Sequence, residues 1–251
     1  MKSIAVRWIF LFDIDGTLLS TGGAGRYAMS RTFMCLHGID NALEEMSLGG
    51  KTDPQIYDEA ARRWNVAPRL EPFQELYFQT LAEELPRFNG RGHLMPGITP
   101  LLRYLAQRSD CLLGLLTGNW QEGARLKLKY FGIEDYFACG AFGDDAADRL
   151  ELSGIARRRA EAAAGSLLDA TATCLVIGDT PRDIACARTA ACRAVAVATG
   201  DYSLSELMRH APDHIFPSLA DTGCFCQQVG LPAPLGLDFP NCDAFLRLCS
   251  R

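Results

Sequence analysis

Residues 4–17 read IAVRWIFLFDIDGT, so that nine largely apolar residues lead directly into Asp13, with Asp15 two positions later. A short continuous apolar run predicts a strand that is buried on both faces, as in a parallel sheet. Gly16 permits the chain to turn after this strand, so both carboxylates can address one site at its end. The alternative is a plain loop, in which Asp15 and Gly16 form a turn and Thr17 caps a helix.

Strand and helix patterns alternate through much of the remaining chain. Three further apolar runs end in polar, Gly-containing segments: Cys111–Leu116 before Thr117-Gly118-Asn119, Cys174–Ile177 before Gly178-Asp179, and Ala194–Ala198 before Thr199-Gly200. A shorter candidate strand is Tyr136–Phe142, and helical patterns cover Pro100–Arg108, Gln121–Phe131, Leu150–Ala164 and Pro181–Ala191. This alternation predicts an α/β fold with a doubly wound, Rossmann-like parallel sheet. The polar residues stand at the carboxyl ends of its strands, where such folds bind ligands.

One long segment interrupts the alternation. Between Thr21 and Gly92 we find only helical patterns, at Gly25–His37, Pro54–Trp64 and Glu71–Leu85. About 70 residues are far more than one crossover needs, so we expect an inserted all-α cap domain. The predicted division is a catalytic core of residues 1–20 and 93–221, a cap of residues 21–92, and an irregular C-terminal tail of residues 222–251. The Gly-rich stretches at residues 21–23 and 89–92 are the expected hinges.

Composition excludes several classes of protein. The chain has 251 residues, 48% hydrophobic and 22% charged, which is typical of a globular protein with a core. A net charge of −5 gives no electrostatic footprint for nucleic acid or an anionic membrane. No apolar run approaches the ~20 residues of a membrane span, and the N-terminal run, interrupted by Arg7, does not fit a signal peptide. Most of the ten cysteines lie in apolar runs and no CxxC occurs, so we expect reduced thiols and a cytoplasmic location. The oligomeric state stays open.

A second pair of carboxylates, Asp179 and Asp183, follows another predicted strand. Asp179 or Thr180 is expected to cap the next helix, with Pro181 in its first turn. If this strand lies beside the first, Asp13 and Asp179 converge with Asp15. Several carboxylates at one point repel each other unless a hard cation joins them, and Mg²⁺ prefers such oxygen ligands.

The segment Thr117-Gly118-Asn119 combines a hydroxyl, a flexible backbone and an amide at the start of a predicted helix. Helix N-termini with free N–H groups suit phosphate, so all three residues are candidates for phosphate binding. The alternative for Asn119 is a plain helix N-cap.

The ordered set Asp-x-Asp-Gly-Thr, Thr-Gly-Asn and Gly-Asp-x-x-x-Asp resembles the haloacid dehalogenase superfamily over about residues 4–221. The helical insertion is similar to the cap of its phosphoglycolate phosphatase and β-phosphoglucomutase branch. The resemblance implies a Mg²⁺-dependent phosphatase that acts on a small phosphorylated metabolite, with phosphoglycolate as one plausible type. A phosphosugar mutase of the same superfamily and a non-catalytic binding or regulatory protein on this fold stay as alternatives.

The resemblance also implies a role for each matching residue. Asp13 attacks phosphorus and forms an aspartyl-phosphate, while Asp15 protonates the leaving oxygen and then activates water. Asp13, the backbone carbonyl of Asp15, and Asp179 hold Mg²⁺. Thr117 hydrogen-bonds the transferring phosphoryl group, and Asp183 anchors metal-bound water or supports the loop.

The superfamily also places a cation on the phosphate, usually a Lys followed by Pro, and this sequence lacks that pair in the expected interval. Arg149, at the start of a predicted helix, is the best match, because its planar fork can pair with phosphate oxygens. Arg157, Lys127 and Lys129 are weaker candidates, and for both lysines we prefer a solvated helix face. In the predicted cap, Lys51 stands in a Gly-rich turn, where cap closure can bring it onto substrate.

Overall fold

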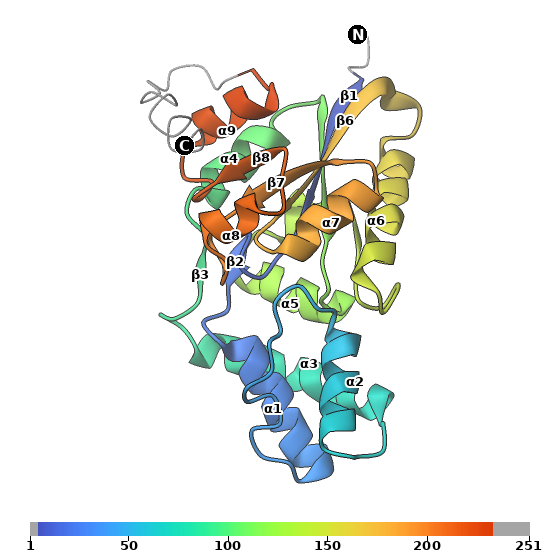
Figure 1. The fold of residues 1–251 in the computed structure, drawn as a ribbon, viewed down its shortest axis with the longest axis vertical. Coiled ribbons are helices and arrows are strands. Elements are labelled where there is room, and N and C mark those ends of the chain that lie inside the picture. The colour runs from blue at the N-terminus through green and yellow to red at the C-terminus, as the bar shows by residue number, and fades with distance from the viewer. Residues whose placement is uncertain (1–4, 233–251) are drawn as a thin grey trace.

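The computed structural model describes residues 5–232, and a six-stranded sheet lies at the centre of its larger part (Figure 1). Its strands are β1 (Val6–Phe12), β4 (Cys111–Leu116), β5 (Cys139–Ala141), β6 (Leu168–Gly178), β7 (Arg193–Val197) and β8 (His214–Phe216). The strand order is β5-β4-β1-β6-β7-β8, and every adjacent pair is parallel. From β1 the chain continues to β4 on one side and later to β6 on the other, so β1 marks the topological switch.

Helices cover both faces of the sheet, which confirms the predicted doubly wound α/β class. One layer contains α4 (Ile98–Ala106), α5 (Gln121–Tyr130) and α9 (Thr222–Val229), and the other contains α6 (Arg149–Ala164) and α7 (Pro181–Thr189). Short helical segments in the connections are α8 (Leu204–Met208), Glu134–Tyr136 and Gly165–Leu167. Phe10 and Phe12 of β1 enter the first layer, while Ile9 and Leu11 enter the second. Burial on both faces explains why β1 is continuously apolar.

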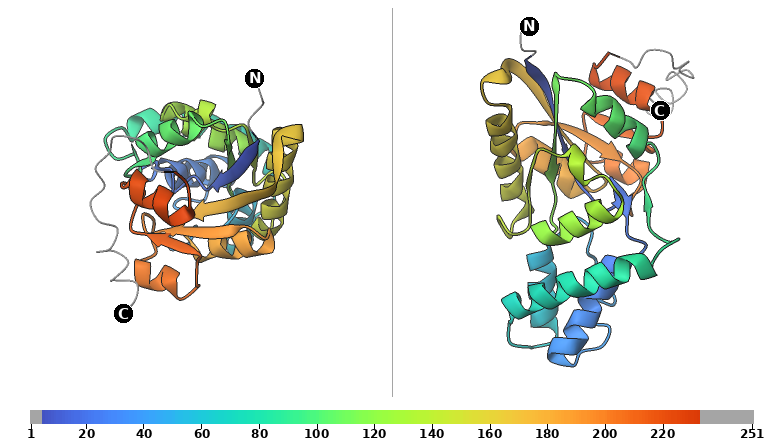
Figure 2. Two further views of the ribbon diagram at one scale, coloured as in Figure 1. Left: turned by 90° about the horizontal axis from the view of Figure 1, so that it is seen from above. Right: turned by 180° about the vertical axis from the view of Figure 1, so that it is seen from behind.

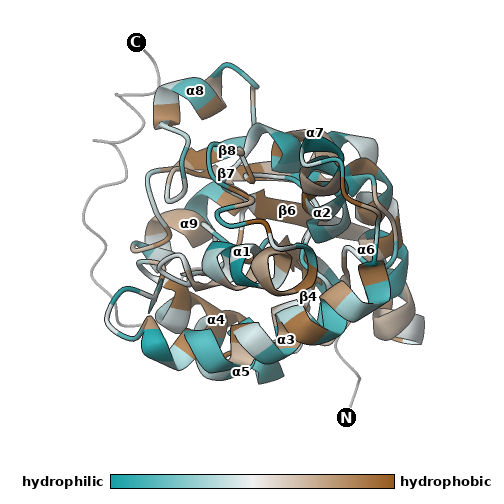
Figure 3. Ribbon diagram, turned by 90° about the horizontal axis from the view of Figure 1, so that it is seen from below, coloured by the Kyte–Doolittle hydropathy of each residue, from teal (hydrophilic) through white to brown (hydrophobic). Residues whose placement is uncertain are grey.

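The long insertion forms a separate group of helices beyond the carboxyl edge of the sheet (Figures 1 and 2). These helices are α1 (Ala24–His37), α2 (Asp53–Arg63) and α3 (Leu70–Arg87). They have a hydrophobic cluster of their own, which includes Phe33, Tyr57 and Phe73. Seen from the insertion side and coloured by hydropathy, the strands behind the helices are largely apolar (Figure 3). The exact division into core and cap stays our proposal.

The two connections between core and insertion are paired with each other, which the sequence did not predict. Two short strands, β2 (Leu19–Ser20) and β3 (His93–Leu94), form an antiparallel pair. Beyond them the Gly-rich segments meet, because a Cβ atom on Gly22 would lie 2.5 Å from the Cβ of Arg91. Gly22 also has a φ of +63°, which other residues rarely adopt. The predicted hinge segments therefore run side by side.

The prediction of an irregular tail from residue 222 is wrong for the residues that form α9. Asp221 caps this helix by accepting a hydrogen bond from the backbone N–H of Cys224. Phe225 is completely buried against Phe10 and Phe216, with ring centroids 6.2 and 5.6 Å apart. The helix thus completes one hydrophobic layer of the core. Residues 233–251 of the predicted tail lie outside the described part of the chain.

Two further expectations concern thiols and membranes. The eight cysteines within residues 5–232 are all free. Over the same residues, no helix combines the length and the apolar character needed to cross a bilayer.

Candidate active site

Three neighbouring strands deliver polar residues to one edge of the sheet. Asp13 follows β1, Thr117 follows β4, and Asp179 follows β6. In the parallel register, Phe12 of β1 pairs with residues at the corresponding ends of β4 and β6. Because parallel strands end at the same edge, the register brings the three polar residues together, as the strand order requires.

Asp13 is a buried carboxylate, only 5% exposed, at the centre of this edge. Its backbone N–H donates to the carbonyl of Ile177 at 2.9 Å, which continues the sheet pairing by one residue. Burial raises the pKa of the Asp13 carboxyl to about 6, although the nearby Arg149 guanidinium acts in the opposite direction. Because burial disfavours the ionised carboxylate, its negative charge needs a cation close by.

Asp179 is fixed by close packing on both sides. Its Oδ1 accepts a hydrogen bond from Thr17 Oγ1 at 2.9 Å. A Cβ atom on Gly16 would lie 2.4 Å from Asp179 Oδ2, and one on Gly200 would lie 1.8 Å from it, so both positions need glycine. Burial and then the neighbouring carboxylates raise the pKa of Asp179 to about 8.

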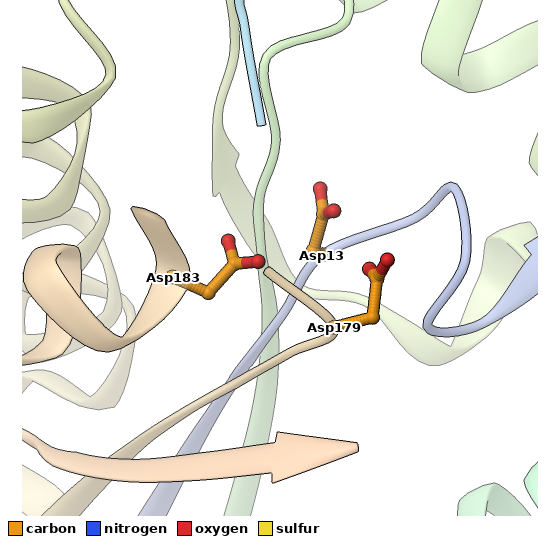
Figure 4. A group of neighbouring side chains, drawn as sticks. All are labelled: Asp13, Asp179 and Asp183. Atoms are coloured by element: carbon orange, nitrogen blue, oxygen red, sulfur yellow. The ribbon is translucent and has the colours of Figure 1, made fainter. Parts of the chain in front are cut away.

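The carboxylates of Asp13, Asp179 and Asp183 approach one another closely enough to hold one ion (Figure 4). One oxygen from each lies within 4.8 Å of the others, and all three residues are buried. Asp183 is already engaged, because its Oδ2 accepts from the backbone N–H and hydroxyl of Thr180 at 3.0 and 2.7 Å. Buried oxygen donors that repel one another fit a hard divalent cation such as Mg²⁺. Asp13 and Asp179 also line the cavity above the strand ends, so these two side chains are the better placed to hold an ion that substrate can reach.

Arg149 reaches this cluster from the first turn of α6. Its Nη2 lies 2.9 Å from Asp13 Oδ1 and 2.7 Å from Asp183 Oδ1, and the side chain is buried. Its Nε is also buried and has no hydrogen-bond partner within the described residues. The guanidinium thus joins the two carboxylates. Arg157, a weaker candidate, instead pairs with Glu161 at 2.8 Å on the outside of α6.

The loop after β4 organises its own side chains. The Nδ2 of Asn119 donates to Thr117 Oγ1 and to Asp15 Oδ2, both at 2.8 Å. Gly118 lies against the insertion, because a Cβ atom there would be 2.3 Å from the carbonyl oxygen of Lys51. Asn119 therefore links the loop after β4 to the second carboxylate of β1.

The preference for a solvated Lys127 is wrong. Lys127 is 4% exposed, and its Nζ donates to Asp15 Oδ2 and Asn119 Oδ1, both at 2.6 Å. Lys129, two residues on, is exposed as expected. A signal was present in the sequence, because helical spacing places Lys127 on the same face of α5 as Ala124 and Leu128, which are buried. The sequence did not show, however, that this face of α5 contacts Asp15.

The insertion covers the site and forms part of its wall. A cavity of about 420 Å³ lies between it and the strand ends. Its lining includes the candidate residues Asp13, Asp15, Gly118, Asn119, Arg149, Asp179 and Lys51, and from the insertion Arg26, Met29, Leu48, Ile56 and Tyr77. Lys51 forms an ion pair with Glu59 beside the cavity. Its position is compatible with substrate contact, which stays our proposal.

The loop before α2 is hydrogen-bonded to the core. Thr52 is the N-cap of α2 in a capping box, and its hydroxyl also donates to the carbonyl of Ala147 at 2.8 Å. The backbone N–H of Asp53 donates to the carbonyl of Gly118 at 2.7 Å, and its Oδ2 accepts from the N–H of Trp120 at 2.9 Å. The insertion therefore lies in a closed arrangement over the loop after β4.

Comparison with known proteins gives a family-level similarity. The model of the haloacid dehalogenase-like hydrolases matches residues 9–191, which include the ends of β1, β4 and β6. No curated protein sequence matches the chain.

Several solved structures share the fold. CbbY from Rhodobacter sphaeroides, solved in complex with phosphate, is 21% identical with a TM-score of 0.67, over 87% of this chain and 96% of that one. A protein from Haemophilus somnus described as a predicted phosphoglycolate phosphatase is 19% identical with a TM-score of 0.62, over 88% and 97%. A β-phosphoglucomutase candidate from Thermotoga maritima is 18% identical with a TM-score of 0.58, over 88% and 99%. Because the three sequences are at most 21% identical to this chain, the similarity shows a shared fold alone.

Proposed function

The chain belongs to the haloacid dehalogenase-like hydrolases, and from this premise we propose that it is a Mg²⁺-dependent phosphatase that acts through an aspartyl-phosphate on Asp13. The observation that carries the proposal is the pairing of charges at the end of β1. The buried Asp13 carboxylate has the Arg149 guanidinium at 2.9 Å and the Asp179 carboxylate beside it. A candidate nucleophile, a cation for phosphate oxygens and a metal-binding acid thus lie side by side in one cavity.

In the first half of the reaction, a carboxylate oxygen of Asp13 forms a bond to phosphorus while the bond from phosphorus to the ester oxygen breaks. Asp15 donates its proton to that leaving oxygen, which departs as an alcohol. Arg149, which lines the cavity beside Asp13, supports the phosphoryl group as the nearby positive charge.

In the second half, Asp15 accepts a proton from water, and the water oxygen bonds to phosphorus. The bond between phosphorus and Asp13 breaks, which releases phosphate and restores the carboxylate. Asp13, the backbone carbonyl of Asp15, and Asp179 would hold Mg²⁺, which supplies positive charge between the carboxylate and phosphate anions. Further closure of the insertion over the strand ends would keep bulk water from the reactive acyl-phosphate.

The substrate we propose is a small phosphomonoester, with phosphoglycolate-like compounds among the candidates. The cavity of about 420 Å³ is at the small end for ligand sites and must hold both the phosphoryl group and the leaving group. The fold similarity to a structure described as a predicted phosphoglycolate phosphatase supports the same class of substrate.

The test is release of inorganic phosphate from a panel of phosphorylated metabolites, with Mg²⁺ and with EDTA. We expect hydrolysis of at least one small phosphomonoester only with Mg²⁺, and a loss of at least about 10³-fold in Asp13→Asn, because the nucleophile is removed. Asp169→Asn, at the other end of β6, is the control and should retain the rate.

No hydrolysis across the panel, or an Asp13→Asn variant as active as the parent, would refute the proposal. A mutase would instead exchange phosphoryl groups among hexose phosphates and need a bisphosphate primer. A non-catalytic protein would bind phosphoesters without turnover.

A further inference from the structure

The cavity has two buried cations, and each contacts a different carboxylate from the end of β1. Arg149 contacts the proposed nucleophile Asp13 at 2.9 Å, whereas Lys127 contacts Asp15 at 2.6 Å. The role of Arg149 follows from the proposed phosphoryl transfer. The role of Lys127 does not, and it needs its own explanation.

Lys127 is buried at the boundary between core and insertion. Only 6% of its side chain is exposed, and its Nζ lies 3.6 Å from the place of a Cβ atom on Gly25 in α1. Its charge faces Asp15 and also Asp53, since burial raises the pKa of Asp53 to about 7 and Lys127 is the main opposing influence. An ammonium group is unfavourable in such a place unless it is paired. The surrounding carboxylates therefore stabilise it there.

The hydrogen bonds of Lys127 fix the orientation of its neighbours. An ammonium group only donates, so the amide of Asn119 must turn its Oδ1 toward Lys127 and its Nδ2 toward Asp15. Both donors then converge on the same atom, Oδ2 of Asp15. The other oxygen, Oδ1, has no hydrogen-bond partner within residues 5–232. The carboxylate is thereby held by one oxygen and left open at the other, although 44% of this side chain is exposed.

We propose that Lys127 is a positioning residue for the phosphatase reaction: together with Asn119 it holds Oδ2 of Asp15, so that Oδ1 exchanges the catalytic proton. This inference rests on the proposed function and deepens it. As the bond from phosphorus to the ester oxygen breaks, the proton on Oδ1 moves to that oxygen. In the second half, Oδ1 takes a proton from water. Because one oxygen of the exposed Asp15 carboxylate is already hydrogen-bonded, the side chain loses less orientational entropy when it enters the proton-transfer step.

The proposal predicts a dependence on the leaving group. An alkyl ester leaves as a strongly basic alkoxide and therefore needs the proton from Asp15. An aryl ester such as p-nitrophenyl phosphate leaves as a stabilised phenolate and needs the proton far less. Loss of Asp15 positioning should therefore damage alkyl ester hydrolysis selectively, whereas general damage to the fold would lower both rates alike.

The experiment compares kcat/KM for p-nitrophenyl phosphate and for an alkyl phosphate that the parent protein hydrolyses. The variants are Lys127→Met, Asp15→Asn, the double variant, and Lys129→Met as the control on the exposed face of α5. We expect Lys127→Met to lose at least about ten times more activity on the alkyl than on the aryl ester. In the Asp15→Asn background, Lys127→Met should cause little further loss of activity, because the two residues act as a unit. Lys129→Met should match the parent.

Equal losses on both esters in Lys127→Met, or a full additional loss in the double variant, would overturn the role of Lys127 while leaving the phosphatase function intact. A parent protein without Mg²⁺-dependent hydrolysis would overturn the function and this inference together. If Lys127→Met does not fold, Asn119→Ala removes the other donor to Oδ2 and should show the same selectivity. Its failure to do so would also refute the proposal.

Discussion

Asp53 is a buried carboxylate that takes no part in the proposed reaction. It is 7% exposed at the start of α2, and burial raises its pKa from 3.8 to about 7. The folded protein therefore binds this proton more tightly than the unfolded chain does. Between about pH 4 and pH 7 the folded state holds more protons, so the contribution of Asp53 to stability decreases as pH rises.

Asp53→Asn removes this titration and leaves an oxygen that can accept from the N–H of Trp120. We expect the difference in free energy of unfolding between Asp53→Asn and the parent to shift in favour of the variant by about 1 kcal/mol or more between pH 5 and pH 8. One pKa unit corresponds to about 1.4 kcal/mol. Urea unfolding at the two pH values measures the difference, and Asp58→Asn, at an exposed position of α2, is the control. A difference that does not change with pH would contradict the prediction.

At the scale of elements, α5 connects the active-site loop to the insertion. Trp120 is its N-cap residue, yet the indole is 1% exposed within the hydrophobic cluster of the insertion. Its ring centroid lies 5.6 Å from that of Tyr77 and 6.1 Å from those of Phe73 and Phe78, all in α3. The core thus contributes a large side chain to the interior of the insertion, which restrains the movement of α3 over the site.

Trp120→Ala should destabilise the protein by about 3–5 kcal/mol, because it leaves a cavity among aromatic rings. We also expect the amide protons of α3 to exchange faster with solvent, which hydrogen exchange measures directly. Trp64→Ala is the control, since Trp64 is 40% exposed and its loss leaves a smaller cavity. Unchanged protection of α3 in Trp120→Ala would show that the indole does not anchor this helix.

At the scale of the whole molecule, the site is assembled from strands that lie far apart in sequence. Thr17 and Asp179, which share a hydrogen bond, are 162 positions apart. A cation held between Asp13 and Asp179 would bind the folded chain and not the unfolded one. Mg²⁺ should therefore raise the melting temperature of the parent protein by several degrees at about 100 times its Kd, equivalent to about 2.7 kcal/mol.

A thermal-shift titration with MgCl₂ tests this expectation without any need for activity. Asp179→Asn should abolish the shift, because it removes one of the proposed ligands. Asp169→Asn, near the amino end of the same strand, should retain it. An equal shift in parent and Asp179→Asn would place the ion elsewhere.

Much of the fold could be predicted from local patterns. The apolar runs predicted β1, β4, β6 and β7, and the predicted carboxyl ends lie within a few residues of the observed ones. Burial on both faces leaves a continuous apolar signature in the sequence. The spacing of helical patterns also predicted α1 to α3 within the insertion. The shorter elements β8, α8 and α9 were missed, because three to eight residues carry too little periodicity to distinguish them from loops.

The sequence by itself determined that Asp13, Thr117 and Asp179 stand at strand ends, because strand patterns and the residues after them are local properties. The tertiary structure alone decided which cation contacts which carboxylate. Lys127 and Asp15 are 112 positions apart, and α5 shows the same mixture of apolar and charged residues as a surface helix. A lysine becomes buried only where partners for its charge arrive from other parts of the chain. Those partners are supplied here by the end of β1 and the loop after β4, and no pattern within α5 contains that information.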